Sequence, residues 1–455
     1  MTSLFIFRLD LRVVDNIGLI KCFQNSNKII PCFIFDTRQI NREKNLYFSN
    51  NCVQFMIESL KELYLECNKK LLFFYGDTPK IVRYLIKKLE INSVYLNQDY
   101  TPYSINRDNL IKTICEKYNV LYNPCDDILL NPIDAIMKDD GQPYSTFTNY
   151  HQKASKLKVS QPDTKKVTSK FVSVDSKLQH SYNNKKLDKF YDKNEDINVN
   201  GGRRLALKIL NEINNQKNYN QERSLCAYKS THLSAYIKFG CVSIREVYHK
   251  FLDVLGDNND LLKQLYWREF YYNLIYHYPK TYTHKIGLKE IYSKFPWSHN
   301  KQHFDAWCQG ETGFPIVDAS MKHLNKTGYM PNRSRLIVAN FLTKILRIDW
   351  TWGEKYFACA LVDYSPSNNL GNWQWVVSIG ADYQNRIYNP SSQSVKSDPE
   401  GVYIKKWLPV LKDVPIKDIH NWHKVYDKYQ INYSQPIIVY EDEYKKSKQL
   451  FSKYK

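Results

Sequence analysis

The chain has 455 residues, 43% of them hydrophobic and 24% charged, which is the composition of a globular protein large enough for two or three domains. Lys and Arg outnumber Asp and Glu by 65 to 46, and the formal net charge of +19 favours a polyanionic partner such as nucleic acid. No long apolar run and no signal peptide can be recognised, so we expect a protein that neither spans a membrane nor is secreted.

The Cys and Trp residues add two constraints. The ten Cys form no Cys-x-x-Cys pair and no ligand-like cluster with the eleven His, so no metal site is expected, and their spread fits a reducing, intracellular compartment. All nine Trp lie at or after Trp267, which indicates two domains with different roles. The excess of Lys has a simpler alternative explanation, namely solvated charge on loops and tails.

The first 130 residues alternate short apolar runs with amphipathic segments. Strands are predicted at residues 4–7, 29–35, 71–75, 93–96 and 120–122, and helices at 53–67 and 79–89. This alternation predicts an α/β domain over residues 1–130, built on a doubly wound parallel sheet. No Gly-x-Gly-x-x-Gly or Walker loop occurs, which disfavours an ordinary dinucleotide or nucleoside triphosphate site.

The rest of the chain reads differently. Residues 131–200 lose the alternation and, from residue 153, are rich in Lys, Ser, Asp and Asn, so they are predicted to be a long, mostly irregular connector. From residue 201 onward the pattern is helical, with helices predicted at 205–213, 261–276 and 328–346. Residues 201–455 are therefore predicted to form an all-α domain, whose aromatic interior could enclose a large planar cofactor.

One predicted helix carries an unusual face. Gln264, Trp267, Arg268 and Tyr271 stand at positions i, i+3, i+4 and i+7, so an amide, an indole, a guanidinium and a phenol lie on one side. A buried face of this polarity calls for a ligand, and the alternative is a solvated polar face.

The segment 363–375 concentrates further chemistry. It holds two Trp and three Asn, and Asn369 and Trp373 share a face if the segment is helical. Its amides can form hydrogen bonds with a polar heterocycle, and its indoles can stack on a ligand or carry electrons. The alternative interpretation is a purely structural one, in which the segment is a buried aromatic turn. Arg333 or Arg335 could pair with Asp363 or with phosphate, or could form a plain surface salt bridge. The turn Ser230-Thr-His-Leu-Ser234 suits a phosphate or a plain helix cap.

Several ordered motifs resemble those of one family. They include Phe7-Arg-Leu-Asp-Leu-Arg12, Trp267-Arg-Glu-Phe-Tyr271, Gly313-Phe-Pro-Ile-Val-Asp318, Gly371-Asn-Trp373 and Arg386-Ile-Tyr-Asn-Pro390. Along nearly its full length the chain resembles the photolyase/cryptochrome flavoproteins, with class I cyclobutane pyrimidine dimer photolyases as the best match. The resemblance implies an α/β antenna-type domain followed by an all-α FAD-binding catalytic domain.

The resemblance also implies roles for individual residues. Those around FAD are Tyr219, Ser230, Thr231, His232, Leu233, Ser234, Arg268, Tyr271, Arg335, Asp363 and Asn369. Asn369 falls at the position that faces flavin N5. Trp373, Trp350 and Trp297 match a chain that passes electrons to photoexcited flavin. Either Trp373→Phe or Trp297→Phe is therefore expected to block photoreduction of the flavin. The residues implied in lesion and DNA binding are Arg223, Gln264, Trp267, Asn332, Arg333, Leu336, Trp375 and Gln393.

The function implied is light-dependent DNA repair, in which excited reduced FAD passes an electron to a cyclobutane pyrimidine dimer and splits it. A cryptochrome-like photoreceptor without repair and a six-four photoproduct photolyase remain as alternatives. The expected partner is ultraviolet-damaged DNA, the protein is expected to be a monomer located wherever that DNA is, and a folate or deazaflavin antenna is a further possibility for the first domain.

Some positions depart from the family pattern. Cyclobutane-dimer enzymes usually have Glu where this chain has Gln264, which can donate a hydrogen bond but cannot ionise. Two acids expected near the flavin are replaced by Ser365 and Ile345. Six-four enzymes carry a His pair where this chain has Asn332 and Leu336, so the balance favours cyclobutane dimers.

Overall fold

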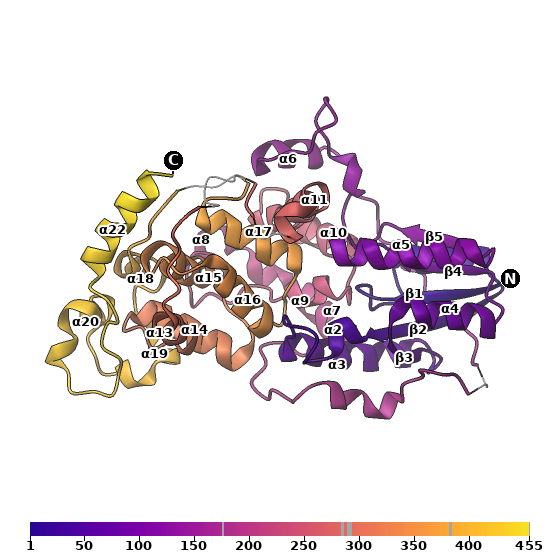
Figure 1. Cartoon of the computed structure of the whole chain (residues 1–455), viewed down its shortest axis with the longest axis horizontal. Coiled ribbons are helices and arrows are strands. Elements are labelled where there is room, and N and C mark those ends of the chain that lie inside the picture. The colour runs from indigo at the N-terminus through magenta and orange to yellow at the C-terminus, as the bar shows by residue number, and fades with distance from the viewer. Residues whose placement is uncertain (175–176, 284–285, 289–293, 382–384, 455) are drawn as a thin grey trace. The chain divides into compact units, whose positions relative to one another are not determined.

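A computed structural model describes residues 1–174, 177–283, 286–288, 294–381 and 385–454 (Figure 1). The chain forms two compact units. The first combines Met1–Asn194, Val199–Lys217 and Thr231–Pro279, and the second combines Glu195–Asn198, Asn218–Ser230 and Lys280–Lys455. The domain borders at residues 130 and 200 remain predictions.

The first unit contains a five-stranded sheet of order β3-β2-β1-β4-β5, in which all neighbours pair in parallel. The strands are β1 (Thr2–Phe7), β2 (Lys28–Asp36), β3 (Leu72–Gly76), β4 (Ser93–Asn97) and β5 (Leu121–Cys125). All five predicted strands are confirmed, although β5 runs three residues further than expected. It includes Pro124, which is tolerated because β5 is an edge strand.

Helices cover both faces of this sheet, so the predicted doubly wound arrangement is confirmed (Figure 1). Leu4 and Ile6 point to the face packed by α4 (Thr78–Lys88) and α5 (Pro102–Lys117). Phe5 points to the other face, where it meets α1 (Ile17–Asn25) at Gly18. On the same side Tyr64 of α3 (Asn50–Glu66) lies against Phe73 of β3. Both faces are apolar because both are buried.

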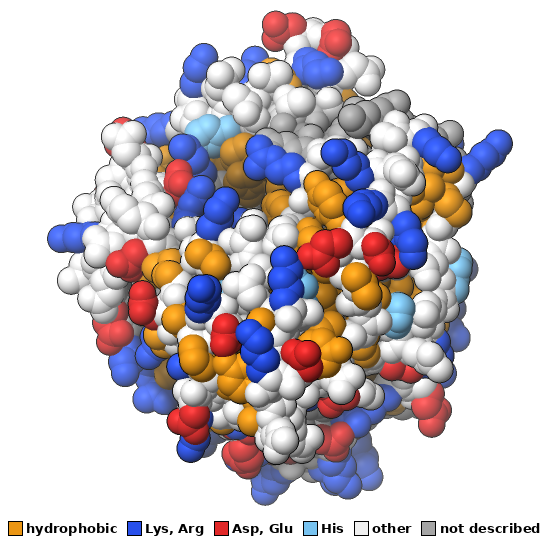
Figure 2. All heavy atoms as spheres, turned by 90° about the vertical axis from the view of Figure 1, so that its left-hand side faces the viewer, with side chains coloured by type: hydrophobic (Ala, Val, Ile, Leu, Met, Phe, Trp, Pro, Cys, Tyr) orange, Lys and Arg blue, Asp and Glu red, His pale blue; other side chains and the backbone are white. Residues whose placement is uncertain are grey.

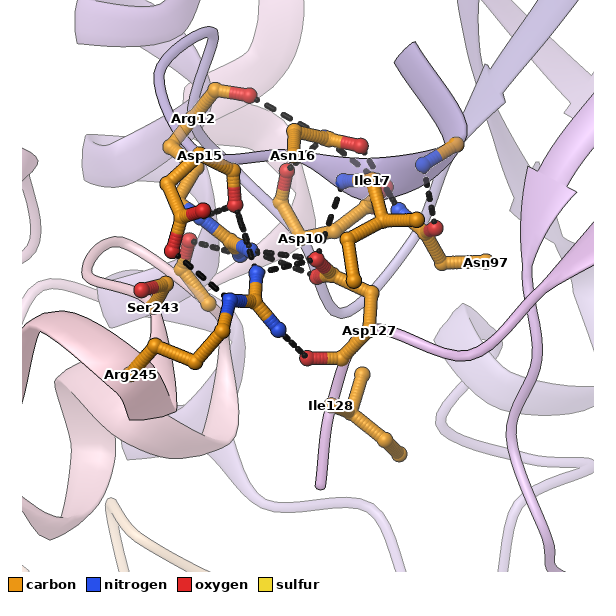
Figure 3. Close-up of polar contacts among 12 residues, drawn as sticks. Asp10, Arg12, Asp15, Asn16, Ile17, Asn97, Asp127, Ile128, Ser243 and Arg245 are labelled. Carbon is orange, nitrogen blue, oxygen red and sulfur yellow. Dashed lines mark hydrogen bonds and ion pairs between the residues drawn. The ribbon is translucent and has the colours of Figure 1, made fainter. Parts of the chain in front are cut away.

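A buried ionic cluster ties the loops that follow β1 and β5 to α10 (Ile244–Leu255), and its contacts are drawn in Figure 3. The Asp127 carboxylate accepts hydrogen bonds from Arg12 at 2.6 and 2.8 Å and from Arg245 at 2.8 Å. Arg245 also pairs with Asp15 at 3.0 Å. Burial raises the pKa of Asp127, but the charges of Arg12 and Arg245 outweigh it and hold that pKa below its usual value. The cluster therefore holds the backbone in place at Asp127, immediately before Ile128.

The segment after β5 is mostly irregular, as predicted. It contains the helix α6 (Phe147–Ala154) and then follows the sheet through the isolated bridges Ile29↔Phe171 and Phe74↔Ser181. The remaining helices of the first unit are α2 (Thr37–Ile40), α7 (Arg203–Asn211), α9 (Ser234–Lys238) and α11 (Asp260–His277).

The described part of the second unit is helical, in agreement with the predicted all-α domain. Its helices are α8 (Tyr219–Glu222), α12 (Pro279–Thr283), α13 (Lys301–Gln309), α14 (Pro315–Thr327), α15 (Asn332–Asn340), α16 (Trp350–Ala360), α17 (Pro366–Val377), α18 (Pro390–Ser397), α19 (Val402–Trp407), α20 (Ile416–His420), α21 (Trp422–Val425) and α22 (Tyr440–Ser452).

The prediction of one helix over residues 328–346 was wrong about where that helix begins. Gly328 has a φ of +69° and ends α14 in the left-handed conformation, which glycine adopts most readily. Pro331 then precedes α15, and a π-helical turn, Phe341–Ile345, continues it.

The described residues show neither a membrane-spanning helix nor a metal-binding cluster. None of their helices is long and apolar enough to cross a membrane, and no group of three or more His, Cys, Asp or Glu among them could hold a metal ion. On the face drawn in Figure 2, Lys and Arg are interspersed with Asp and Glu, so the positive charge there is not one unbroken patch.

Candidate functional site

The polar face predicted around residue 267 lies on α11, in the first unit. Tyr271 is buried, whereas Gln264, Trp267 and Arg268 remain half-exposed. Arg268 donates to the carbonyl of Ile128 at 2.8 Å. The loop that contains Ile128, held by the ionic cluster of Figure 3, therefore orients the Arg268 guanidinium.

Glu269 is a residue to which the sequence analysis gave no role. Its side chain is 1% exposed, and one carboxylate oxygen accepts the Leu130 amide while Oε2 is buried without a partner. Burial raises the pKa of Glu269 to about 7. Asn273, one turn on, donates to Ile133 at 2.8 Å. The chain after β5 is thus held along α11 by contacts on successive turns.

The segment predicted to bind phosphate is divided between the units. Tyr219 and Ser230 belong to the second unit, and Tyr219 is buried at the start of α8. Thr231 to Ser234 belong to the first unit, where Thr231 Oγ1 accepts the Leu233 amide at 3.2 Å just ahead of α9. His232 has a φ of +55°, the turn conformation that brings the chain into this helix.

The predicted pairing of Arg335 with Asp363 is confirmed. Arg335 Nη2 lies 3.1 and 3.0 Å from the two Asp363 oxygens, and Arg335 Nε donates to Met330 at 2.8 Å. The Asp363 side chain is only 6% exposed, so the pair is more than a surface salt bridge. It joins α15 to the segment that leads into α17.

The segment 363–375, for which a helix and a buried aromatic turn were both considered, contains α17, with Pro366 at its first turn. Asn369 is 8% exposed and donates its amide hydrogens to the carbonyl of Glu354 at 2.9 Å and to its carboxylate at 3.1 Å. Among the described residues nothing donates to Asn369 Oδ1. Ser367 Oγ and Asn368 Oδ1 are buried without partners. Three oxygens in the first turns of α17 are therefore available to a polar group, so these turns fit a heterocyclic cofactor.

The three tryptophans implied in electron transfer all lie in the second unit. Trp373 and Trp350 are 2% and 4% exposed, and Trp297 is half-exposed. Within the described residues none of the three is in ring contact with another. Trp373 instead meets Trp307 edge-on at 6.4 Å.

That contact begins a chain of rings. Trp307 stacks on Phe304 at 5.9 Å, and Phe304 meets the half-exposed Trp352 at 5.1 Å. Trp297 has different neighbours, Phe295 at 4.3 Å and Phe451 of α22 at 6.4 Å.

The positions implied in lesion and DNA binding within the second unit are accessible. Asn332 is exposed, and Arg333 and Leu336 are half-exposed on the first turns of α15. Trp375 is half-exposed on α17, a helix in contact with α15. Arg223, at the end of α8, is exposed, and Gln393 of α18 is half-exposed.

A second polar cluster, which the sequence analysis did not identify, lies where β1 and β4 end. Arg8 and Arg107 both contact Asp108, at 2.5 and 3.0 Å, and Ser104 donates to Asp99 Oδ2 at 2.7 Å. Four buried atoms nevertheless have no hydrogen-bond partner within the described part of the chain: Arg8 Nε, Asp99 Oδ1, Tyr103 OH and Arg107 Nη2.

The position of this cluster is informative. In the strand order β3-β2-β1-β4-β5, the connections from β1 run to β2 and β3 on one side of β1, whereas β4 and β5 lie on its other side. The strand order therefore reverses between β1 and β4, and parallel sheets commonly bind ligands at the carboxyl ends of the strands that flank such a reversal. Burial lowers the pKa of Arg107, helped by the charge of Arg8. The unpaired atoms make this end of the sheet a candidate ligand site.

Two family models match the chain. One, described as DNA photolyase, matches residues 3–167, and the other, described as the FAD binding domain of DNA photolyase, matches residues 261–453. A deoxyribodipyrimidine photo-lyase of Synechococcus sp. is 32% identical over 434 residues, which cover 91% of this chain and 89% of that protein.

Solved structures give the same answer. The photolyase of Sulfolobus tokodaii, crystallised with two FAD molecules, is 37% identical with a TM-score of 0.89, and the match covers 100% of both chains. The cryptochrome of Synechocystis sp. PCC6803 is 25% identical with a TM-score of 0.90, over 99% of both chains. The resemblance inferred from the motifs is confirmed, and it extends to repair enzymes and to a cryptochrome.

Proposed function

The chain belongs to the DNA photolyase family of flavoproteins, and from this premise we propose that it is a light-dependent enzyme that splits cyclobutane pyrimidine dimers in ultraviolet-damaged DNA. The observation that carries the proposal is the set of accessible flat and polar side chains at the implied lesion positions. Trp267 and Trp375 are half-exposed indoles, and Asn332 and Arg333 add an amide and a cation. A flipped-out dimer needs flat apolar walls and a few hydrogen-bond donors, and within the second unit alone Trp375, Asn332 and Arg333 are side chains of these kinds.

FAD is the cofactor of the family, and the residues present fit it. When bound, reduced FAD supplies the light-driven electron that opens the dimer. Asn369, held by Glu354, would present its free Oδ1 to an N–H of the ring system. In the same unit the Arg335–Asp363 pair would bind the polar edge of that ring system.

The two alternatives differ in what they require of the chain. A six-four photolyase needs an acid at the lesion, and Asn332 and Leu336 supply none. A cryptochrome-like photoreceptor shares the fold, as the Synechocystis structure illustrates, and fold alone does not decide function. The net charge of +19 and the accessible lesion residues favour repair.

One assay separates these functions. Reduced, FAD-loaded protein is mixed with an ultraviolet-damaged oligonucleotide and kept dark or exposed to blue or near-ultraviolet light, and both lesion types are counted. We expect cyclobutane dimers to disappear only in the light and six-four lesions to persist. If neither lesion is repaired although the flavin is fully reduced, the chain is a photoreceptor.

We also propose that the cluster at the ends of β1 and β4 holds a second light-absorbing cofactor. Arg8 Nε, Arg107 Nη2 and Tyr103 OH are spare donors, and Asp99 Oδ1 is a spare acceptor. A ring edge with an N–H between two carbonyls, as in a flavin or deazaflavin, satisfies this pattern better than a folate pterin, which carries an amino group there. The Sulfolobus tokodaii structure holds two FAD molecules.

Asp99→Asn is expected to remove this second cofactor. Asn keeps only one acceptor oxygen, for which the Ser104 hydroxyl and the ring N–H would compete, and it loses the negative charge that strengthens the bond to the ring. Protein reconstituted with excess FAD and then desalted should fall from about two flavins per chain to one. Asp139→Asn, at an exposed carboxylate, is the matched control and should keep both. A ratio unaffected by Asp99→Asn would place the second chromophore elsewhere.

A further inference from the structure

Trp267 is covered on one face by a residue distant in sequence. Phe147, at the start of α6, lies parallel to the Trp267 indole with ring centroids 3.7 Å apart and planes inclined by 8°. Phe147 is itself 8% exposed. Trp267 nonetheless remains half-exposed, so its accessible area belongs to its other face and its edges.

Other rings hold Phe147 in place. His151, one turn further along α6, stacks on Phe147 at 5.5 Å and meets the edge of Tyr266 at 5.0 Å. Phe270 of α11 lies against both Phe147 and Trp267, at 5.9 and 5.8 Å. The Phe147 ring is therefore fixed on several sides, and an indole stacked on it has little freedom to rotate about χ1 and χ2.

We propose that Phe147 is a positioning residue for lesion recognition, which fixes the plane of Trp267 and leaves one indole face for a flipped pyrimidine dimer. The proposal rests on the role of Trp267 in the proposed function. Stacking on a dimer is productive only when the indole already lies in the required plane, because an indole that must be ordered on binding loses side-chain entropy. Phe147 orders the indole before DNA arrives.

The test compares variants of the full, FAD-loaded chain in the dark. Binding of an oligonucleotide with one cyclobutane thymine dimer, and of the same oligonucleotide undamaged, is measured by fluorescence anisotropy. Phe147→Ala should weaken binding of the dimer by up to about tenfold, which is the cost of ordering one large side chain on binding, and change binding of undamaged DNA less than about twofold. Repair per bound dimer at saturating DNA should stay unchanged.

Further variants separate positioning from simple loss of packing. Phe147→Tyr keeps a ring and should bind the dimer as the parent does, whereas Phe147→Leu keeps the volume without the ring plane and should resemble Phe147→Ala. Phe190→Ala is the matched control, because Phe190 stacks on Tyr182 at 4.7 Å elsewhere in the same unit. Its dimer binding should remain at the parental level.

The outcomes also separate this inference from the proposed function. If Trp267→Ala weakens dimer binding and neither Phe147→Ala nor Phe147→Leu does, the positioning role is overturned alone. If Phe147→Tyr is as weak as Phe147→Ala, the ring plane is not the cause and the inference again fails. If Trp267→Ala itself binds the dimer normally, the proposed lesion site is wrong.

Discussion

Replacing Trp373 by Phe is expected to abolish light-driven reduction of oxidised FAD in this protein. Trp373 is buried on α17, the helix that carries Asn369, and its ring packs so closely on α16 that a Cβ at Gly353 would come within 2.2 Å of it. Phe is much harder to oxidise than Trp, so the innermost donor is lost. Reduction is followed by the loss of the oxidised-flavin absorbance band under blue light with an external reductant.

Trp297→Phe is expected to have a smaller effect than Trp373→Phe. The sequence alone predicts that either substitution blocks reduction, but Trp373 also touches Trp307, from which Phe304 leads to the half-exposed Trp352. Trp307 is itself an oxidisable indole in contact with Trp373, so it offers Trp373 a second electron donor that avoids Trp297. Trp307→Phe combined with Trp297→Phe should slow reduction more than either change alone.

Two controls keep the electron path apart from packing. Trp422→Phe removes an equally buried indole, 2% exposed, that hydrogen-bonds to Ser434 and is not part of either route, so its photoreduction should be normal. Chemically pre-reduced Trp373→Phe protein should still repair dimers, because repair needs no external electron once FAD is reduced. Normal photoreduction by Trp373→Phe would assign this indole to packing.

Local pattern was sufficient to predict the elements that carry the site. The strands of the first unit are continuous apolar runs, and α11 follows from helical spacing, so they were placed from residues close in sequence. For α17 a buried aromatic turn remained an alternative. The Arg335–Asp363 pair joins positions 28 residues apart. The residues alone left open which of Arg333 and Arg335 pairs with Asp363, and the choice of Arg335 came from the family resemblance.

Contacts between distant segments were not predictable in this way. Phe147 and Trp267 are 120 positions apart, and Glu269 and Leu130 are 139 apart, so no periodicity links them. The cluster at the ends of β1 and β4 was not predicted for the same reason, because its residues come together only through the strand order of the sheet. The start of α15 was missed because Gly328 ends one helix rather than beginning the next.

Asp127→Asn is expected to destabilise the first unit by about 3–5 kcal/mol, the cost of removing one partner from a buried ion pair. Asp127 is 1% exposed and accepts from both Arg12 and Arg245, so Asn would leave two buried guanidinium groups facing an amide. The free energy of unfolding is measured from urea titrations monitored by circular dichroism. Flavin content should fall as well, because Ile128, the next residue, orients Arg268.

The pH dependence of this loss gives a sharper check. The folded-state pKa of Asp127 lies below its usual value, so its contribution to stability is present above the unfolded pKa of about 4 and disappears as the pH falls through the folded pKa. The difference between parent and Asp127→Asn protein should therefore be constant from neutral pH down to about pH 5 and shrink only in stronger acid. Asp139→Asn, at a fully exposed carboxylate, should shift stability by at most about 0.5 kcal/mol at neutral pH. Equal stability of Asp127→Asn and parent protein at neutral pH would mean that the arginines of the cluster are held by backbone carbonyls alone.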